Sequence, residues 1–126
     1  MDVVNAAAST TLFTIAMADP ESSTGFCRWS LLFVHGGNQQ TAAGTFTWAA
    51  TNDGAASTPG INWALDTQEL GAGALVVDNF LITFANPTLT VAINLATGSD
   101  LNAGPTDTQQ ITMIIEQGEN RDITLG

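Results

Sequence analysis

The sequence has 126 residues, with 12 acidic and only two basic side chains and a formal net charge of −10. Affinity for nucleic acid depends on cationic side chains that release counterions from phosphate. Arg28 and Arg121 are the only Lys or Arg residues, and two cations are too few to favour binding to DNA, RNA or an anionic membrane surface. The composition, 44% hydrophobic and 11% charged, supports one folded domain and lacks the signature of disorder.

Alternation of apolar and polar residues predicts strands from the start of the chain. The first half is expected to hold four, over residues 11–17, 26–35, 42–50 and 61–65. In the second of these, Leu32 and Val34 make the second face apolar as well. That pattern is typical of a central strand covered on both sides.

The second half of the chain shows the same alternation, with a period of two residues, more clearly. Four further strands are predicted, over residues 75–84, 88–96, 110–117 and 121–125. Ala85-Asn86-Pro87 separates the first two, which therefore form a hairpin. No segment carries a convincing apolar stripe at helical spacing. We therefore expect an all-β fold, an antiparallel β-sandwich or jelly-roll-like domain of about seven or eight short strands. This single domain would span residues 10–126, with an extended N-terminal arm over residues 1–9.

Two residues with reactive side chains occur once each. Cys27 excludes an intrachain disulfide. It shares a strand face with Trp29 and Leu31, so we expect a buried apolar thiol. His35 ends an apolar strand, where a histidine bonded to backbone is favoured over a catalytic base. No nucleophile stands at a recognisable spacing from it, and we expect no enzymatic activity.

Acidic loops offer a weak calcium site. Asp100, Asn102 and Asp107 supply the hard oxygen ligands that Ca²⁺ prefers, but the EF-hand pattern is incomplete. We expect no cofactor beyond such a structural Ca²⁺. No glycine-rich phosphate loop is present.

The three tryptophans allow two interpretations. Trp29, Trp48 and Trp63 each stand on the apolar face of a predicted strand, which favours core packing. If one were exposed, it could stack on a sugar. A carbohydrate-binding or adhesin module, using an exposed Trp and loop carboxylates, is therefore the alternative function.

Targeting signals are expected to be absent. Leu12–Ala18 ends in an A-x-A pattern, but the preceding stretch has Asp2 and no cation, whereas a secretory signal needs a positive start. No apolar run approaches the roughly 20 residues of a membrane span. We expect synthesis in a host cytoplasm without a signal peptide.

A neutral-polar surface rich in Thr, Asn, Gln and Ser suits contact with other proteins, because burying such groups costs less than burying charges. With no catalytic set and no means to bind a packaged genome, the sequence favours a structural virion protein. It would be a capsid decoration or cement protein, or a spike, on the outer surface of a bacteriophage shell. Its partners would be the shell protein and its own copies, in a homo-oligomer such as a trimer. The expected interface residues are Val3, Val4, Asn52, Asp53, Asn102 and Thr106.

Overall fold

The computed structural model describes residues 9–35, 38–54, 57–69, 77–95 and 108–126. Within these ranges the chain forms eight strands and no helix. In chain order they are β1 (Thr10–Ala16), β2 (Ser22–His35), β3 (Asn38–Thr51), β4 (Gly60–Glu69), β5 (Val77–Ala85), β6 (Thr88–Leu95), β7 (Thr108–Gln117) and β8 (Ile123–Leu125). The all-β prediction is confirmed. The proposed arm lies outside the described residues, apart from Ser9.

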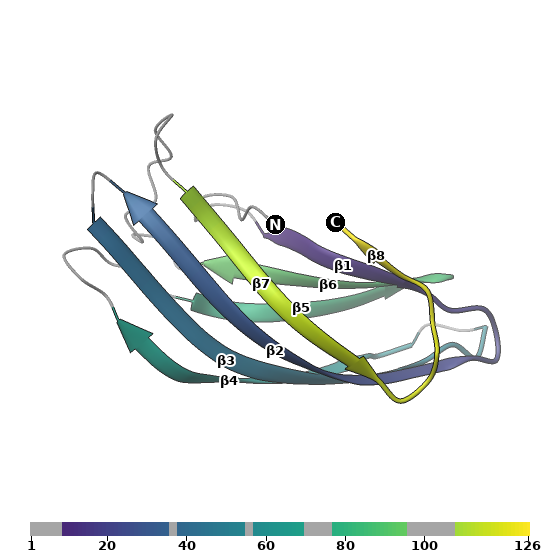
Figure 1. Cartoon of the computed structure of the whole chain (residues 1–126). Coiled ribbons are helices and arrows are strands. Elements are labelled where there is room, and N and C mark those ends of the chain that lie inside the picture. Colours follow the sequence, from purple (N-terminus) through teal and green to yellow (C-terminus); the bar gives the residue numbers. More distant parts are fainter. Residues whose placement is uncertain (1–8, 36–37, 55–56, 70–76, 96–107) are drawn as a thin grey trace.

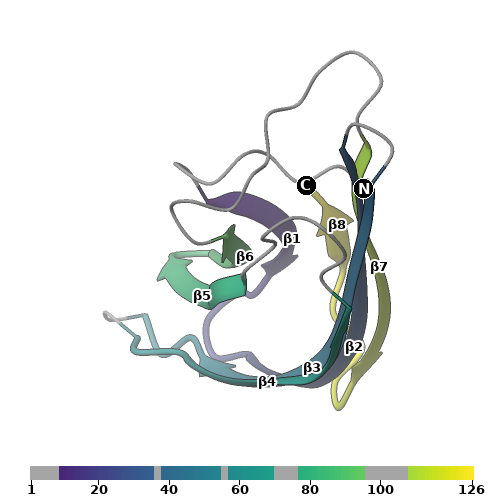
Figure 2. The ribbon, with the colours of Figure 1, turned by 90° about the vertical axis from the view of Figure 1, so that its left-hand side faces the viewer.

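The strands form two antiparallel sheets packed as a β-sandwich (Figure 1). We call the sheet with strand order β4-β3-β2-β7 the long sheet and the sheet with order β5-β6-β1-β8 the short sheet. Figure 2 shows the long sheet curving around the short one. The predicted hairpin is β5–β6, with Ala85 opposite Thr88 across the Asn86-Pro87 turn.

The β2–β3 hairpin is longer than the sequence predicted. Its pairing is continuous from Ser22 opposite Thr51 to His35 opposite Asn38. The added segments, residues 22–25 and 38–41, carry little apolar alternation, which is why the pattern did not reveal them. Their backbone groups nevertheless pair across the hairpin, since a paired strand needs no apolar side chains.

An aromatic cluster joins the two sheets. Phe80 of the short sheet lies between three rings of the long sheet, with centroid distances of 5.1 Å to Trp29, 4.9 Å to Phe46 and 5.6 Å to Trp63. Phe13 of β1 packs on the Trp48 ring at 5.5 Å. Aromatic pairs prefer particular ring geometries, and they stabilise the fold beyond the burial of their apolar surface.

The packing of this cluster depends on two glycines. A Cβ at Gly25 would overlap the ring of Trp48, and a Cβ at Gly44 would overlap Trp29 and the backbone oxygen of Ala64. Only a residue without a side chain lets these indoles lie flat on the sheet.

One irregularity changes the inward face of β1. The pairing with β6 shifts register between Thr11 and Phe13. Both Leu12 and Phe13 are then fully buried, although strict alternation placed only Phe13 inward. A β-bulge adds one residue to a strand and so turns two neighbours to the same side.

Candidate protein-interaction surface

The long sheet turns one face away from the core, and the strand register fixes its side chains. Arg28 lies between Thr45 and Ile114, and Ser30 lies between Ala43 and Thr112. We call this side of the long sheet the outer face. Its side chains, from β2, β3 and β7, are those of Phe26, Arg28, Ser30, Leu32, Thr41, Ala43, Thr45, Thr47, Gln110, Thr112, Ile114 and Glu116. Arg28 and Glu116 are its charged members.

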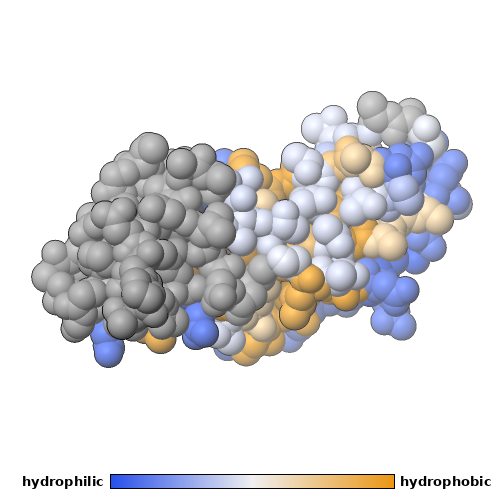
Figure 3. Space-filling model, turned by 90° about the horizontal axis from the view of Figure 1, so that it is seen from above, coloured by the Kyte–Doolittle hydropathy of each residue, from blue (hydrophilic) through white to orange (hydrophobic). Residues whose placement is uncertain are grey.

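Large apolar side chains of the outer face are open to solvent. Ile114 is 59% exposed, Leu32 38% and Phe26 36%. The prediction that β2 is covered on both sides is wrong, because no described element packs on this face. Figure 3 views the molecule from above and not onto the outer face; on that side too, hydrophobic surface lies in the middle and hydrophilic surface mainly at the right-hand end. Exposed apolar groups on a surface with few charges are typical of protein contacts.

The centre of the outer face is hollowed. A depression of about 530 Å³ lies over Ser30, Ala43 and Thr112, bordered by Leu32 and Thr67. These central side chains are small, so a space remains between the longer ones around them. The described lining holds hydroxyl, amide and methyl groups and no ionisable side chain. Such a depression can receive a partner's side chain but offers no group for acid–base chemistry.

The thiol of Cys27 lies on the opposite, buried face of β2. Its side chain has no exposed surface, and burial raises its pKa to about 12. A thiol that stays protonated at neutral pH is a poor nucleophile and a poor metal ligand. The prediction of a buried apolar thiol is confirmed. His35 is the last residue of β2.

The predicted calcium ligands cannot be placed. Asp100, Asn102 and Asp107 lie outside the described residues. Among the residues that are described, no three His, Cys, Asp or Glu side chains lie close enough together to hold a metal ion.

The predicted interface residues fall into two groups. Val3, Val4, Asn102 and Thr106 lie outside the described ranges. Asp53 is exposed, but Asn52 is only 1% exposed. Its side chain therefore faces the protein and not a partner.

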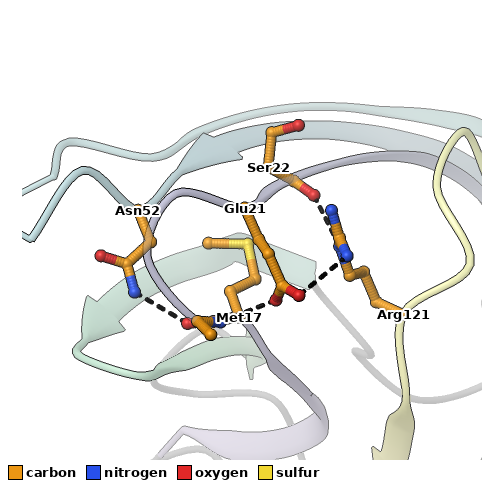
Figure 4. A network of polar contacts seen from close by, with 6 residues as sticks. Met17, Glu21, Ser22, Asn52 and Arg121 are labelled. Atoms are coloured by element: carbon orange, nitrogen blue, oxygen red, sulfur yellow. Dashed lines mark hydrogen bonds and ion pairs between the residues drawn. The ribbon is translucent and has the colours of Figure 1, made fainter.

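Asn52 connects three turns at one end of the sandwich, and Figure 4 shows its contact with Met17. Its Nδ2 donates to the backbone oxygen of Met17 at 2.8 Å and to Oδ1 of Asn86 at 2.9 Å. Its Oδ1 accepts from the backbone N–H of Gly54 at 3.0 Å. The side chain thus holds the β1–β2, β3–β4 and β5–β6 connections together.

Arg121 continues this polar cluster to the β7–β8 connection. Its guanidinium lies 3.2 Å from a carboxylate oxygen of Glu21 and donates from Nε to the backbone oxygen of Ser22 at 2.9 Å. Glu21 also accepts from the backbone N–H of Ala18 at 2.7 Å. Arg121 is thereby used inside the chain, whereas Arg28 points outward from the long sheet.

The tryptophans occupy the core, as their pattern indicated. Trp29 is 1% and Trp48 3% exposed, and Trp48 donates from Nε1 to Ser23 Oγ at 2.9 Å. Trp63 is half-buried, and its Nε1 donates to Oδ1 of Asn79 at 2.9 Å. A sugar-stacking platform would need an exposed indole ring.

No family model matches this sequence, and no curated protein matches it. The tailspike protein of Acinetobacter baumannii phage AM24 is a solved structure that this chain resembles, with 12% sequence identity and a TM-score of 0.37. The likeness covers 95% of this chain and 25% of the tailspike chain, so this chain spans about a quarter of that protein. At this TM-score the likeness does not establish a common fold. No helix in the described ranges is long and apolar enough to cross a membrane.

Proposed function

We propose that this protein is a non-enzymatic structural component of a bacteriophage particle, a decoration or cement protein of the capsid that acts through protein contacts. The observation that carries the proposal is the outer face of the long sheet. It combines exposed Phe26, Leu32 and Ile114 with hydroxyl and methyl groups and two opposite charges.

The energetics of this face favour docking. Full burial of a large apolar side chain is worth about 1.5–3 kcal/mol relative to full exposure. A third or more of each of Ile114, Leu32 and Phe26 is exposed. Part of this burial free energy is therefore still to be gained when a partner covers them. Threonine and serine around them cost less to desolvate than charged side chains do, and no Lys has to lose its hydration.

The virion setting rests on the sequence. A chain with a net charge of −10 and no Lys is repelled by the packaged genome. Such a protein fits the outside of a shell, where its partners are other protein subunits. The alternative of a carbohydrate-binding module has lost one of its two motivating features, because Trp29 and Trp48 are buried and Trp63 is half-buried.

The test is recovery of the protein from particles of the phage that encodes it. Mass spectrometry of purified particles should find hundreds of copies, or a symmetric fraction of the shell copy number. Absence of the protein from the particles would end the proposal.

A pair of variants tests the surface itself. Leu32→Lys places a charge on the outer face, whereas Thr83→Lys places the same charge on an exposed position of β5. In rebinding to particles stripped of the protein, we expect Leu32→Lys to weaken binding at least about tenfold and Thr83→Lys to bind as the wild type does. Equal binding by both variants would contradict the assignment of this face.

A further inference from the structure

One end of the outer face carries both of its charges. In the register of the long sheet Arg28 of β2 lies beside Ile114 of β7, and Phe26 lies beside Glu116. We call these four residues the charged patch. Arg28 and Glu116 are diagonal neighbours in it, roughly 7–8 Å apart along the sheet. Leu32 and the depression lie further along β2, outside the charged patch.

The two charges of this patch have no partner within the part of the chain that the structure describes. Arg28 and Glu116 are both exposed, and neither side chain makes an ion pair or a hydrogen bond there. The apolar groups between them are open as well, with Ile114 59% and Phe26 36% exposed. A partner that covers these apolar groups therefore has to cover the two charges.

The covered charges restrict the chemistry of the partner. A buried charge needs an opposite charge and hydrogen bonds to offset its lost hydration. The partner must therefore bring a carboxylate to Arg28 and a cationic donor to Glu116, at the same separation as these two groups. The charged patch of a second copy carries this pair. In a twofold contact the pairing is reciprocal, so one arrangement satisfies the charges of both copies.

We propose that the charged patch binds the same patch of a second copy, face to face, about a twofold axis that runs along the diagonal from Phe26 to Ile114. Arg28 of each copy then faces Glu116 of the other, and Phe26 and Ile114 each lie against their own copies. Sheets packed face to face are about 10 Å apart, a gap that an arginine and a glutamate pointing toward each other can bridge. The strands of the two copies cross at a steep angle, as in the orthogonal class of sheet packing.

The overall charge also favours this patch for self-association. Two copies with a charge of −10 each repel one another over most approaches. The charges of the patch sum to zero, and the contact adds two attractive pairs. Because the patch is small, we expect a weak, concentration-dependent association. The inference rests on the proposed function in taking the outer face as a contact surface. It makes a twofold pair the building block, in place of the trimer expected from the sequence, and leaves Leu32 and the depression for the shell.

Charge exchange tests the pairing. Arg28→Glu and Glu116→Arg each place like charges face to face, so each variant alone should raise the dissociation constant of the pair at least about tenfold. The first variant makes the chain more negative and the second less negative, so overall charge cannot explain a loss in both. An equimolar mixture of the two should associate as the wild type does, because every contact again joins opposite charges. Sedimentation equilibrium over a concentration series measures the masses, with 13.1 kDa for one chain.

Recovery in the mixture separates pairing between copies from an effect within one chain, and it shows that both variants are folded. Leu32→Lys is the control, because it changes a residue of the outer face beyond the charged patch and should keep the wild-type dissociation constant. A wild type that stays monomeric, or a mixture that associates no better than its components, would overturn the pairing but leave particle binding through Leu32 intact. Absence from particles refutes the proposed function without touching the pair.

Discussion

Cys27 gives the protein a specific response to alkaline pH. Burial raises its pKa from 9.0 to about 12, so between these values the unfolded chain loses a proton that the folded chain keeps. Stability is therefore full below about pH 9 and falls as the pH rises toward 12. The loss between about pH 8 and pH 11 is on the order of 2 kcal/mol. Urea unfolding at several pH values measures it.

This dependence on alkaline pH can be assigned to Cys27, because few other groups of the chain titrate in the same range. The sequence has no Lys and no Tyr, the other side chains that titrate in this range. Cys27→Ala should lower stability at neutral pH by leaving a small cavity, but its stability should then be flat from about pH 8 to pH 11. A wild-type profile that is flat over the same range would contradict the raised pKa.

Gly25 is a second residue with a sharp expectation. Gly25→Ala forces a methyl group into the Trp48 ring, and overpacking of this kind costs about 1–3 kcal/mol. Gly60→Ala is the control, since nothing lies within 4 Å of a Cβ at that position. Thermal unfolding should show a lower Tm for the first variant and an unchanged or slightly higher Tm for the second. Equal Tm values would mean that Trp48 moves without cost.

At the scale of elements, Asn52 holds three turns through one side chain. Asn52→Ala leaves the backbone oxygen of Met17 and the N–H of Gly54 without this partner. Buried groups left unpaired cost about 1–3 kcal/mol. Asn62→Ala removes the same side chain from an exposed position of β4 and should change stability by less than about 0.5 kcal/mol. Chemical denaturation compares the two, and equal losses would argue against the role of Asn52.

The strands themselves were largely predictable. A period of two marked each strand wherever apolar residues such as Phe13, Trp29 and Leu89 alternated with polar ones, because one face of each strand had to enter the core. The ends of β2 and β3 were missed, since pairing by backbone groups leaves no apolar pattern. Asn52 was misread as a surface contact because two of its three partners, Met17 and Asn86, lie in turns distant in the sequence.

The outer face was only half predictable. Leu32 signalled a second apolar face on β2, but sequence alone could not tell a face covered by the same chain from one left for a partner. In β7 the alternation of residues 110–117 predicted Ile115 inward, which the structure confirms, but it left open what the adjacent Ile114 on the other face would contact. Burial in the folded chain resolves it, because Ile115 contacts the core and Ile114 does not.

For the whole molecule, charge sets the response to salt. A net charge of −10 on 126 residues opposes the compact state through self-repulsion, which salt screens. Raising NaCl from about 0.05 M to about 0.5 M shortens the screening length severalfold, and we expect Tm to rise by several degrees. Differential scanning calorimetry measures the shift. A Tm that falls with NaCl would show that attractive ion pairs such as Arg121–Glu21 outweigh the repulsion.

The aromatic cluster between the sheets makes the molecule its own optical reporter. All three indoles sit in or against a single core to which both sheets contribute rings. Emission from the native chain should therefore be blue, and it should shift to the red when the layers come apart. The chain has no lysine for labelling with amine-reactive dyes. Because its own indoles report on the core, separation of the two sheets can be followed in real time without an added label.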